Sequence, residues 1–133
     1  SKICGILRDL KRYYKLAIEM GKQLLNVLEN IWYVVALSEE LVDKPLARTI
    51  CGFPMVIYRG DTGQSMALED RCPHRQAPLS MGNVLGDEIQ CNYHGFRFNG
   101  SGGCTHIPRQ DRVPSTMDIR AFKTVERWGF VWI

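Results

Sequence analysis

The sequence predicts a small, mainly β domain of antiparallel sheets, preceded by one amphipathic helix. Three observations support this fold class. Residues 4–29 contain no proline and carry apolar side chains at helical spacing. After Asn30 the pattern changes to short segments rich in β-branched and aromatic residues, and turn-forming residues separate these segments. We therefore divide the chain into an N-terminal helical extension, residues 1–29, and a β domain, residues 30–133.

The expected helix has one apolar face. Its apolar residues recur at spacings of three, four and seven, and most of its basic residues fall on the other side. This stripe is expected to pack on the body of the chain or on a sister subunit, with attachment to a membrane surface as the alternative. The stripe consists of Leu7, Leu10, Tyr14, Ala17, Leu24 and Leu28.

The β domain is expected to contain eight short strands. Asp61-Thr62-Gly63 and Asn99–Gly103 supply residues that tolerate tight turns, and Trp128-Gly129 is expected at a hairpin tip. The expected strands are Ile31–Leu37, Arg48–Gly52, Met55–Tyr58, Ser65–Leu68, Glu88–Gln90, Phe96–Phe98, Ile119–Val125 and Phe130–Ile133.

Composition limits the classes of function. The chain has 133 residues, 45% hydrophobic and 23% charged, as in ordinary globular domains. Residues 1–30 carry six Lys/Arg and three acidic residues, which accounts for the whole net charge of +3. The rest of the chain is neutral, which argues against a nucleic-acid-binding surface there.

Compartment and metal use follow from the apolar runs and the cysteines. The longest apolar run, residues 32–37, is far shorter than a bilayer span, and no secretory signal is visible. Five cysteines are too few for a disulfide-stapled domain, and their odd number argues against complete pairing. We expect a cytoplasmic protein in which some thiols ligate metal.

Two segments combine cysteine with histidine. Cys72-Pro73-His74-Arg75 and Cys91-Asn92-Tyr93-His94-Gly95 each offer one sulfur and one imidazole, with sixteen residues between His74 and Cys91. This pattern suits a metal held between two loop tips. One interpretation is a structural zinc module, although a Cys-x-His pair fits zinc spacing poorly. The other is a binuclear cluster with two thiolates on one iron and two imidazoles on the second.

These segments resemble a known family. CPHR, followed by APLS at residues 77–80 and by CNYHG and FRF, is similar to the signature of a Rieske [2Fe-2S] domain. The segments NIWYVVA at residues 30–36 and VERWGFVWI at residues 125–133 look like the N-terminal domain of Rieske non-haem iron oxygenases. Within that family the vanillate and dicamba monooxygenase type, aromatic-ring-hydroxylating and O-demethylating enzymes, is the most similar.

The resemblance implies a fold, a ligand set and a function. The fold is the Rieske iron-sulfur fold with two cluster-binding loops. Cys72 and Cys91 correspond to the ligands of the inner iron, and His74 and His94 to those of the outer, solvent-facing iron. The function implied is one-electron transfer through the cluster to the mononuclear Fe(II) of an oxygenase catalytic domain. The electron donor would be an NAD(P)H-dependent reductase or a ferredoxin, and the assembly a homotrimer.

The chain departs from respiratory Rieske proteins in a way that predicts its potential. Those proteins carry a disulfide between the loops and a serine that donates to a cluster sulfur. Here the corresponding residues are Ala77 or its neighbours, Tyr93 and Phe96. Losing donors destabilises the reduced, more negative state, so we predict a midpoint potential of about −150 mV, near the low end of the Rieske range.

The remaining chemical side chains receive mostly structural interpretations. Cys4, Cys51 and Cys104 are expected to be free or buried thiols, and His106 to have a structural or surface role. Arg75 and Tyr93 either tune the cluster or simply pack. Core positions are expected for the aromatic residues Trp32, Tyr33, Trp128 and Trp132, with the polar edges of some at a subunit surface.

Apart from His74 and His94, the chain has one histidine, His106. One histidine cannot complete a mononuclear iron site, which needs two histidines and a carboxylate. We therefore expect the electron-transfer part of an oxidoreductase, unable to activate oxygen without a catalytic domain. The alternative is a free-standing Rieske-type ferredoxin, an electron carrier and not part of an enzyme.

Overall fold

The computed structural model of the chain describes residues 30–42 and 44–133. Within them, eleven short strands form three antiparallel sheets, accompanied by single-turn 3-10 helices. The expectation of a mainly β, antiparallel domain is confirmed. The amphipathic helix expected within residues 1–29 lies outside the described residues.

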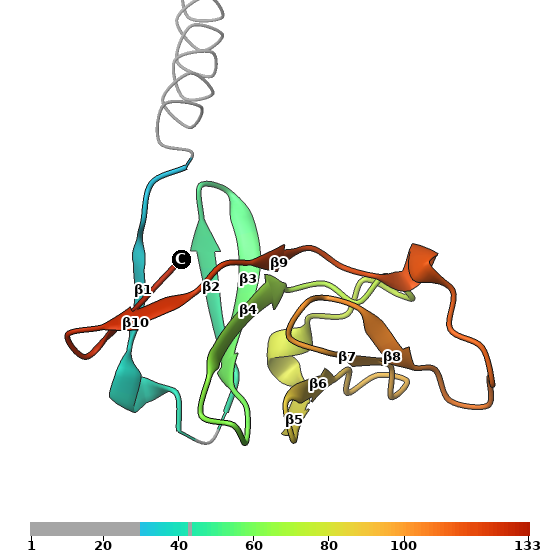
Figure 1. Cartoon of the computed structure of the whole chain (residues 1–133). Coiled ribbons are helices and arrows are strands. Elements are labelled where there is room, and N and C mark those ends of the chain that lie inside the picture. The colour runs from blue at the N-terminus through green and yellow to red at the C-terminus, as the bar shows by residue number, and fades with distance from the viewer. Residues whose placement is uncertain (1–29, 43) are drawn as a thin grey trace, which may run out of the picture. The chain divides into compact units, whose positions relative to one another are not determined.

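Figure 1 shows the central sheet, β2-β3-β4-β9, between the other two. One neighbour is the sheet β1-β11-β10, and the other is β5-β6-β7-β8. The strands are β1 Val34–Leu37, β2 Leu46–Ile50, β3 Phe53–Arg59, β4 Ser65–Glu69, β5 Asn83–Leu85, β6 Glu88–Gln90, β7 Arg97–Phe98, β8 Cys104–His106, β9 Ala121–Phe122, β10 Val125–Arg127 and β11 Phe130–Trp132. The 3-10 helices are η1 Ser38–Glu40, η2 Leu79–Met81 and η3 Ser115–Met117.

The two inner strands of the central sheet, β3 and β4, are buried on both faces. Because side chains alternate along a strand, neighbouring residues of β3 and β4 enter different cores. One core, named here the site core, takes the cross-strand pairs Val56/Leu68 and Tyr58/Met66 and packs against the β5–β8 sheet. The other, named the rear core, takes the pair Ile57/Ala67 and packs against β1 and β11.

The hairpin expected at Trp128-Gly129 is confirmed. Arg127 pairs with Phe130, so a two-residue turn joins β10 to β11. Both turn residues have positive φ, 55° at Trp128 and 77° at Gly129, as a type I′ turn requires.

Two features of the strand pattern differ from expectation. The single strand expected over 119–125 is two strands, β9 and β10, because the chain leaves the central sheet for the β1-β11-β10 sheet between them. At this crossing the Thr124 hydroxyl donates to the Ser65 carbonyl at 2.6 Å. The short strands β5 and β8 were not expected, since their sequences carry little β pattern and cross-strand pairing stabilises them.

Of the four aromatic residues predicted to lie in the core, two are exposed instead. Trp32 is 52% exposed and Trp128 79% exposed, the latter because it stands at the hairpin tip. Tyr33 and Trp132 are half-buried. Trp132 makes an edge-to-face contact with Trp128, with 6.3 Å between ring centroids.

Among the residues described, no helix has the length and apolarity needed to cross a membrane.

Candidate metal centre

Two loops carry the cysteine-histidine pairs. The first loop, residues 70–78, connects β4 to η2, and the second loop, residues 91–96, connects β6 to β7. Each cysteine N–H donates to the carbonyl five residues later at 2.8 Å, from Cys72 to Ala77 and from Cys91 to Phe96. The two loops therefore close with the same backbone geometry.

A second hydrogen bond repeats in both loops. The N–H of Gln76 donates to the Cys72 carbonyl at 2.9 Å, and the N–H of Gly95 donates to the Cys91 carbonyl at 3.0 Å. Both donors have positive φ, 62° and 77°. Gly95 takes this conformation without a Cβ penalty, whereas Gln76 takes it at some cost in backbone strain.

The two thiols lie inside the domain. Cys72 is 1% exposed and Cys91 2% exposed, and both belong to the site core. The pKa of the Cys72 thiol is raised to about 11, mainly by burial and also by the neighbouring Cys91 thiol. Backbone N–H groups of His74 and Arg75 oppose this rise. The sulfurs therefore lie together, and each must lose a proton to bind a metal.

The two imidazoles lie outside. His74 and His94 are both exposed, and their rings meet edge to face with centroids 4.7 Å apart. His74 also stacks on Phe96, with centroids 4.7 Å apart and ring planes 7° from parallel. His94 contacts Tyr93 at 3.9 Å between centroids. The same two loops thus pair the candidate ligands by type, as two neighbouring buried sulfurs and two neighbouring surface imidazoles.

Asp70, which the sequence did not single out, stabilises the first loop through hydrogen bonds to Ser80. One Asp70 carboxylate oxygen accepts from the Ser80 N–H, and the other accepts from the Ser80 hydroxyl, both at 2.7 Å. Charge-assisted bonds of this kind are among the stronger hydrogen bonds in proteins. The sequence signal was the pairing of an acid just before the Cys-x-His motif with a serine just after it.

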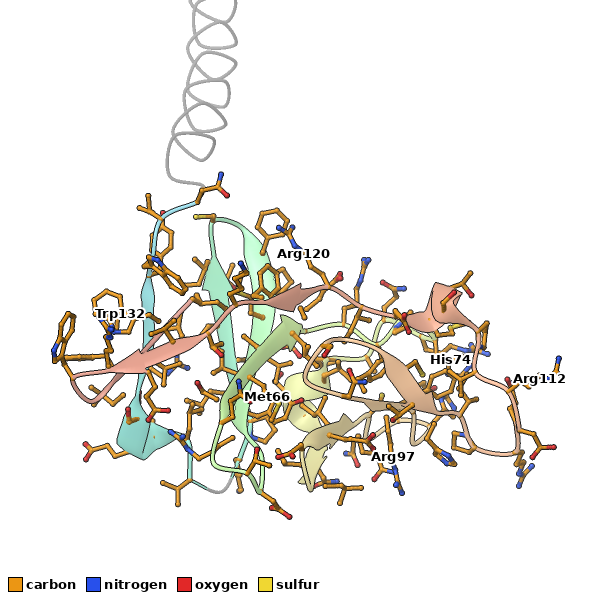
Figure 2. All side chains as sticks on the ribbon, viewed as in Figure 1. Met66, His74, Arg97, Arg112, Arg120 and Trp132 are labelled. Atoms are coloured by element: carbon orange, nitrogen blue, oxygen red, sulfur yellow. The ribbon has the colours of Figure 1, made fainter. Side chains whose placement is uncertain are left out.

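A third loop, residues 107–114, was also missed. Ile107 is buried in the site core with both cysteines, and Val113 packs against that core. A Cβ on Gly95 would lie 3.2 Å from Pro108 Cγ, so the third loop sits directly against the second. Figure 2 shows Arg112, at the tip of this loop, at the same end of the domain as His74. Residues 107–114 contain no cysteine or histidine that would mark them as part of a metal site, so only their packing in the structure identifies this loop.

The two other described cysteines, Cys51 and Cys104, lie outside the two loops, although Cys104 packs against the site core. Cys51 occupies the β2–β3 turn and its thiol donates to the Tyr33 hydroxyl at 3.4 Å. Cys104 is a half-buried thiol on β8, and His106 is exposed on the same strand. The described cysteines are all free thiols. The structural interpretation of these residues stays a prediction.

No three His, Cys, Asp or Glu side chains converge on one point in the part of the chain that the structure describes. A binuclear cluster with two protein ligands on each iron does not need such a group.

The chain belongs to the Rieske [2Fe-2S] domain family. The family model matches residues 31–117, which include both loops and the third loop. The resemblance drawn from the two motifs is thereby confirmed, together with the Rieske fold and its cofactor class.

Several proteins similar to this chain are components of oxygenases. The chain is 46% identical over 110 residues to the dicamba O-demethylase oxygenase component of Stenotrophomonas maltophilia, an alignment covering 82% of this chain and 32% of that protein. It is 43% identical over 105 residues to the vanillate O-demethylase oxygenase subunit of a Pseudomonas strain, covering 79% and 29%. The crystal structure of apo dicamba monooxygenase superposes with a TM-score of 0.76 at 46% identity, covering 79% of this chain and 33% of that one. The chain thus spans about a third of the length of these relatives.

The donor set fits a Rieske cluster. Buried thiols and exposed imidazoles, on two loops with the same backbone closure, match a cluster with one iron inside and one at the surface.

Proposed function

We propose that Cys72 and Cys91 hold the inner iron of a [2Fe-2S] cluster, and that His74 and His94 hold the outer iron. The observation that carries this proposal is the contrast in burial: both sulfurs are nearly inaccessible, while both imidazoles are exposed. Replacing two thiolates by neutral imidazoles reduces the negative charge of the site, which makes an added electron less costly.

The cluster, when bound, supplies a one-electron couple. The residues around the site determine from which side water or a redox partner could approach the cluster. The site core excludes water from the sulfur side, because Leu79, Phe98 and Ile107 pack around the cysteines. On the other side, the exposed rings of His74 and His94 can offer their free N–H groups to a carboxylate on a partner. The histidine face would therefore be the side from which a redox partner could exchange an electron with a bound cluster.

The wider role of the domain rests on its relatives. We propose one-electron transfer from an NAD(P)H-dependent reductase or a ferredoxin to the mononuclear iron of a monooxygenase or O-demethylase catalytic domain. Support comes from the oxygenase components named above, which are about three times as long as this chain. The names of these relatives, a dicamba and a vanillate O-demethylase, favour an aromatic substrate. The family resemblance adds a homotrimer, and the free thiols fit a reducing cytoplasm.

The ligand proposal is tested by paired serine substitutions in the full chain after anaerobic reconstitution. Cys72→Ser should abolish the visible absorption of the cluster, because a buried hydroxyl is a poor replacement for a thiolate. Cys104→Ser is the matched control, a half-buried cysteine outside the two loops, and should retain the spectrum. A full spectrum in Cys72→Ser would contradict the ligand assignment.

The oxygenase proposal is tested by the coding sequence downstream of Ile133. A further ~200 residues, enough for a second domain, with a histidine and carboxylate iron motif would support it. A stop codon soon after Ile133 would instead support the free-standing ferredoxin.

A further inference from the structure

The two cluster loops share the same backbone closure but differ in sequence, and one difference lies at the closing residue. The carbonyl that closes each loop belongs to the fifth residue after the cysteine, which is Ala77 in the first loop and Phe96 in the second. Alanine ends at Cβ, whereas phenylalanine carries a ring across to the other loop. That ring makes the stacked contact with His74 described above.

Phe96 is a fixed platform for this contact. Its ring is 6% exposed and belongs to the site core, together with both cysteines. Its carbonyl is also held, by the Cys91 N–H at 2.8 Å. Because interiors are close-packed, a side chain anchored in this way has little freedom to rotate. The plane of His74 is therefore set from below by the protein core.

His94 has no equivalent support. Its aromatic neighbours are Tyr93, which is 60% exposed, and the edge of His74 itself. The residue of the first loop that corresponds to Phe96 is Ala77, whose side chain ends at Cβ and carries no ring. An imidazole bonded to iron through one nitrogen can still tilt about that bond, and a packed neighbour limits the tilt. The two imidazoles are thus held unequally.

We propose that Phe96 is a positioning residue, which fixes the ring plane of His74 and leaves His94 the more mobile of the two. This inference rests on the proposed function, in which both histidines are cluster ligands. A ligand ring with a fixed plane keeps its outer N–H in one direction, so a partner acceptor on that side meets a pre-oriented donor.

The test is pulsed EPR of the full chain with a reconstituted, reduced cluster, which measures the nitrogen couplings of the two histidines separately. In the unmodified chain, one histidine should show a narrow distribution of couplings and the other a broad one. Two equal distributions would overturn the proposal, and this result needs no variant to fold.

Variants then assign the narrow distribution. Phe96→Leu removes the ring but keeps an apolar side chain, and should broaden the narrow distribution. Phe96→Trp restores a ring that can stack and should keep it narrow. Tyr93→Leu is the matched control, an aromatic neighbour of the other histidine, and should leave the narrow distribution unchanged. A narrow distribution that survives Phe96→Leu overturns the inference. Failure of the proposed function would look different, since the unmodified chain would then give no cluster signal.

Discussion

The two cores on either side of the central sheet share strands β3 and β4 but differ in the side chains that fill them. Among the described residues, those buried in the rear core all have hydrocarbon side chains, such as Ile57, Ala67 and Val131. The site core contains hydrocarbon side chains too, but two thiols lie within it. Strands β3 and β4 each contribute to both cores, because their side chains alternate between the two faces of the sheet. Packing on one face thus stabilises the fold alone, whereas packing on the other also positions the proposed cluster ligands.

The two ends of the domain express the same division. Figure 2 shows His74 at one end and Trp132 at the other. The end with Trp132 carries exposed aromatic residues on the β1-β11-β10 sheet, while the other carries the cysteine-histidine loops.

The largest change in stability is expected when one buried side chain in each core is shortened to alanine, and the effect on the cluster should then distinguish the two cores. Leu79→Ala in the site core and Ile57→Ala in the rear core each remove a fully buried aliphatic side chain. Each should lower the free energy of unfolding by about 2–5 kcal/mol, measured by denaturant titration. Only Leu79→Ala should also speed the loss of cluster absorbance in chelator, because Leu79 packs with the cysteines. Equal cluster loss in both variants would remove the distinction.

The next effect concerns the brace of the first loop. Asp70→Ala removes both hydrogen bonds to Ser80, and should cost about 2–3 kcal/mol and make the cluster more labile. Ser80→Ala removes only the hydroxyl bond and should cost about 1 kcal/mol. If Asp70→Ala cost no more than Ser80→Ala, the backbone bond would not stabilise the loop.

A smaller, pH-dependent effect is expected at the rear of the molecule. Arg59 makes two hydrogen bonds of 2.9 Å to the Glu126 carboxylate, which hold the Glu126 pKa below its ordinary value of 4.5. A carboxyl pKa that is lowered on folding stabilises the fold above that ordinary value, and the stabilisation is lost as the pH falls through the folded pKa.

Glu126→Gln should therefore cost at most about 1 kcal/mol at pH 7, because the pair is partly exposed. The difference from the unmodified chain should shrink in acid unfolding curves, and the cluster spectrum at pH 7 should not change. A difference that grows with acidity would mean that the sign of the pKa shift is wrong.

The smallest effect is expected at His106. This histidine follows Cys104 by two residues, as His74 follows Cys72, but it is exposed on β8. His106→Asn should leave the cluster spectrum unchanged and alter stability by no more than about 0.5 kcal/mol. Loss of absorbance in this variant would show that the second Cys-x-His pair holds metal.

Much of the fold could be predicted from local sequence, and the reasons are physical. The segment Glu88–Gln90 is a strand as expected, and Trp128-Gly129 forms the expected turn, because alternation and turn residues are local signals. The strands β5 and β8 could not be predicted, since their pairing partners, not their own residues, stabilise them. Burial of Trp32 and Trp128 was wrongly expected because aromatic type alone does not tell which face of a sheet is covered.

The candidate site divides in the same way. The motif spacing predicted Cys72, His74, Cys91 and His94, and the fold brings them together, which supports the ligand proposal. The parts that hold them were not predicted. Asp70, the third loop and the stacking of Phe96 on His74 depend on contacts between distant segments, which a single sequence does not reveal.

The central claim, that two buried thiols and two surface imidazoles hold one binuclear cluster, is tested most directly by elemental analysis of the reconstituted chain, followed by EPR after reduction. The account predicts two irons and two acid-labile sulfides per chain, with an EPR signal in the reduced state. Stoichiometric zinc without sulfide, or a colourless sample silent by EPR after reduction, would contradict it.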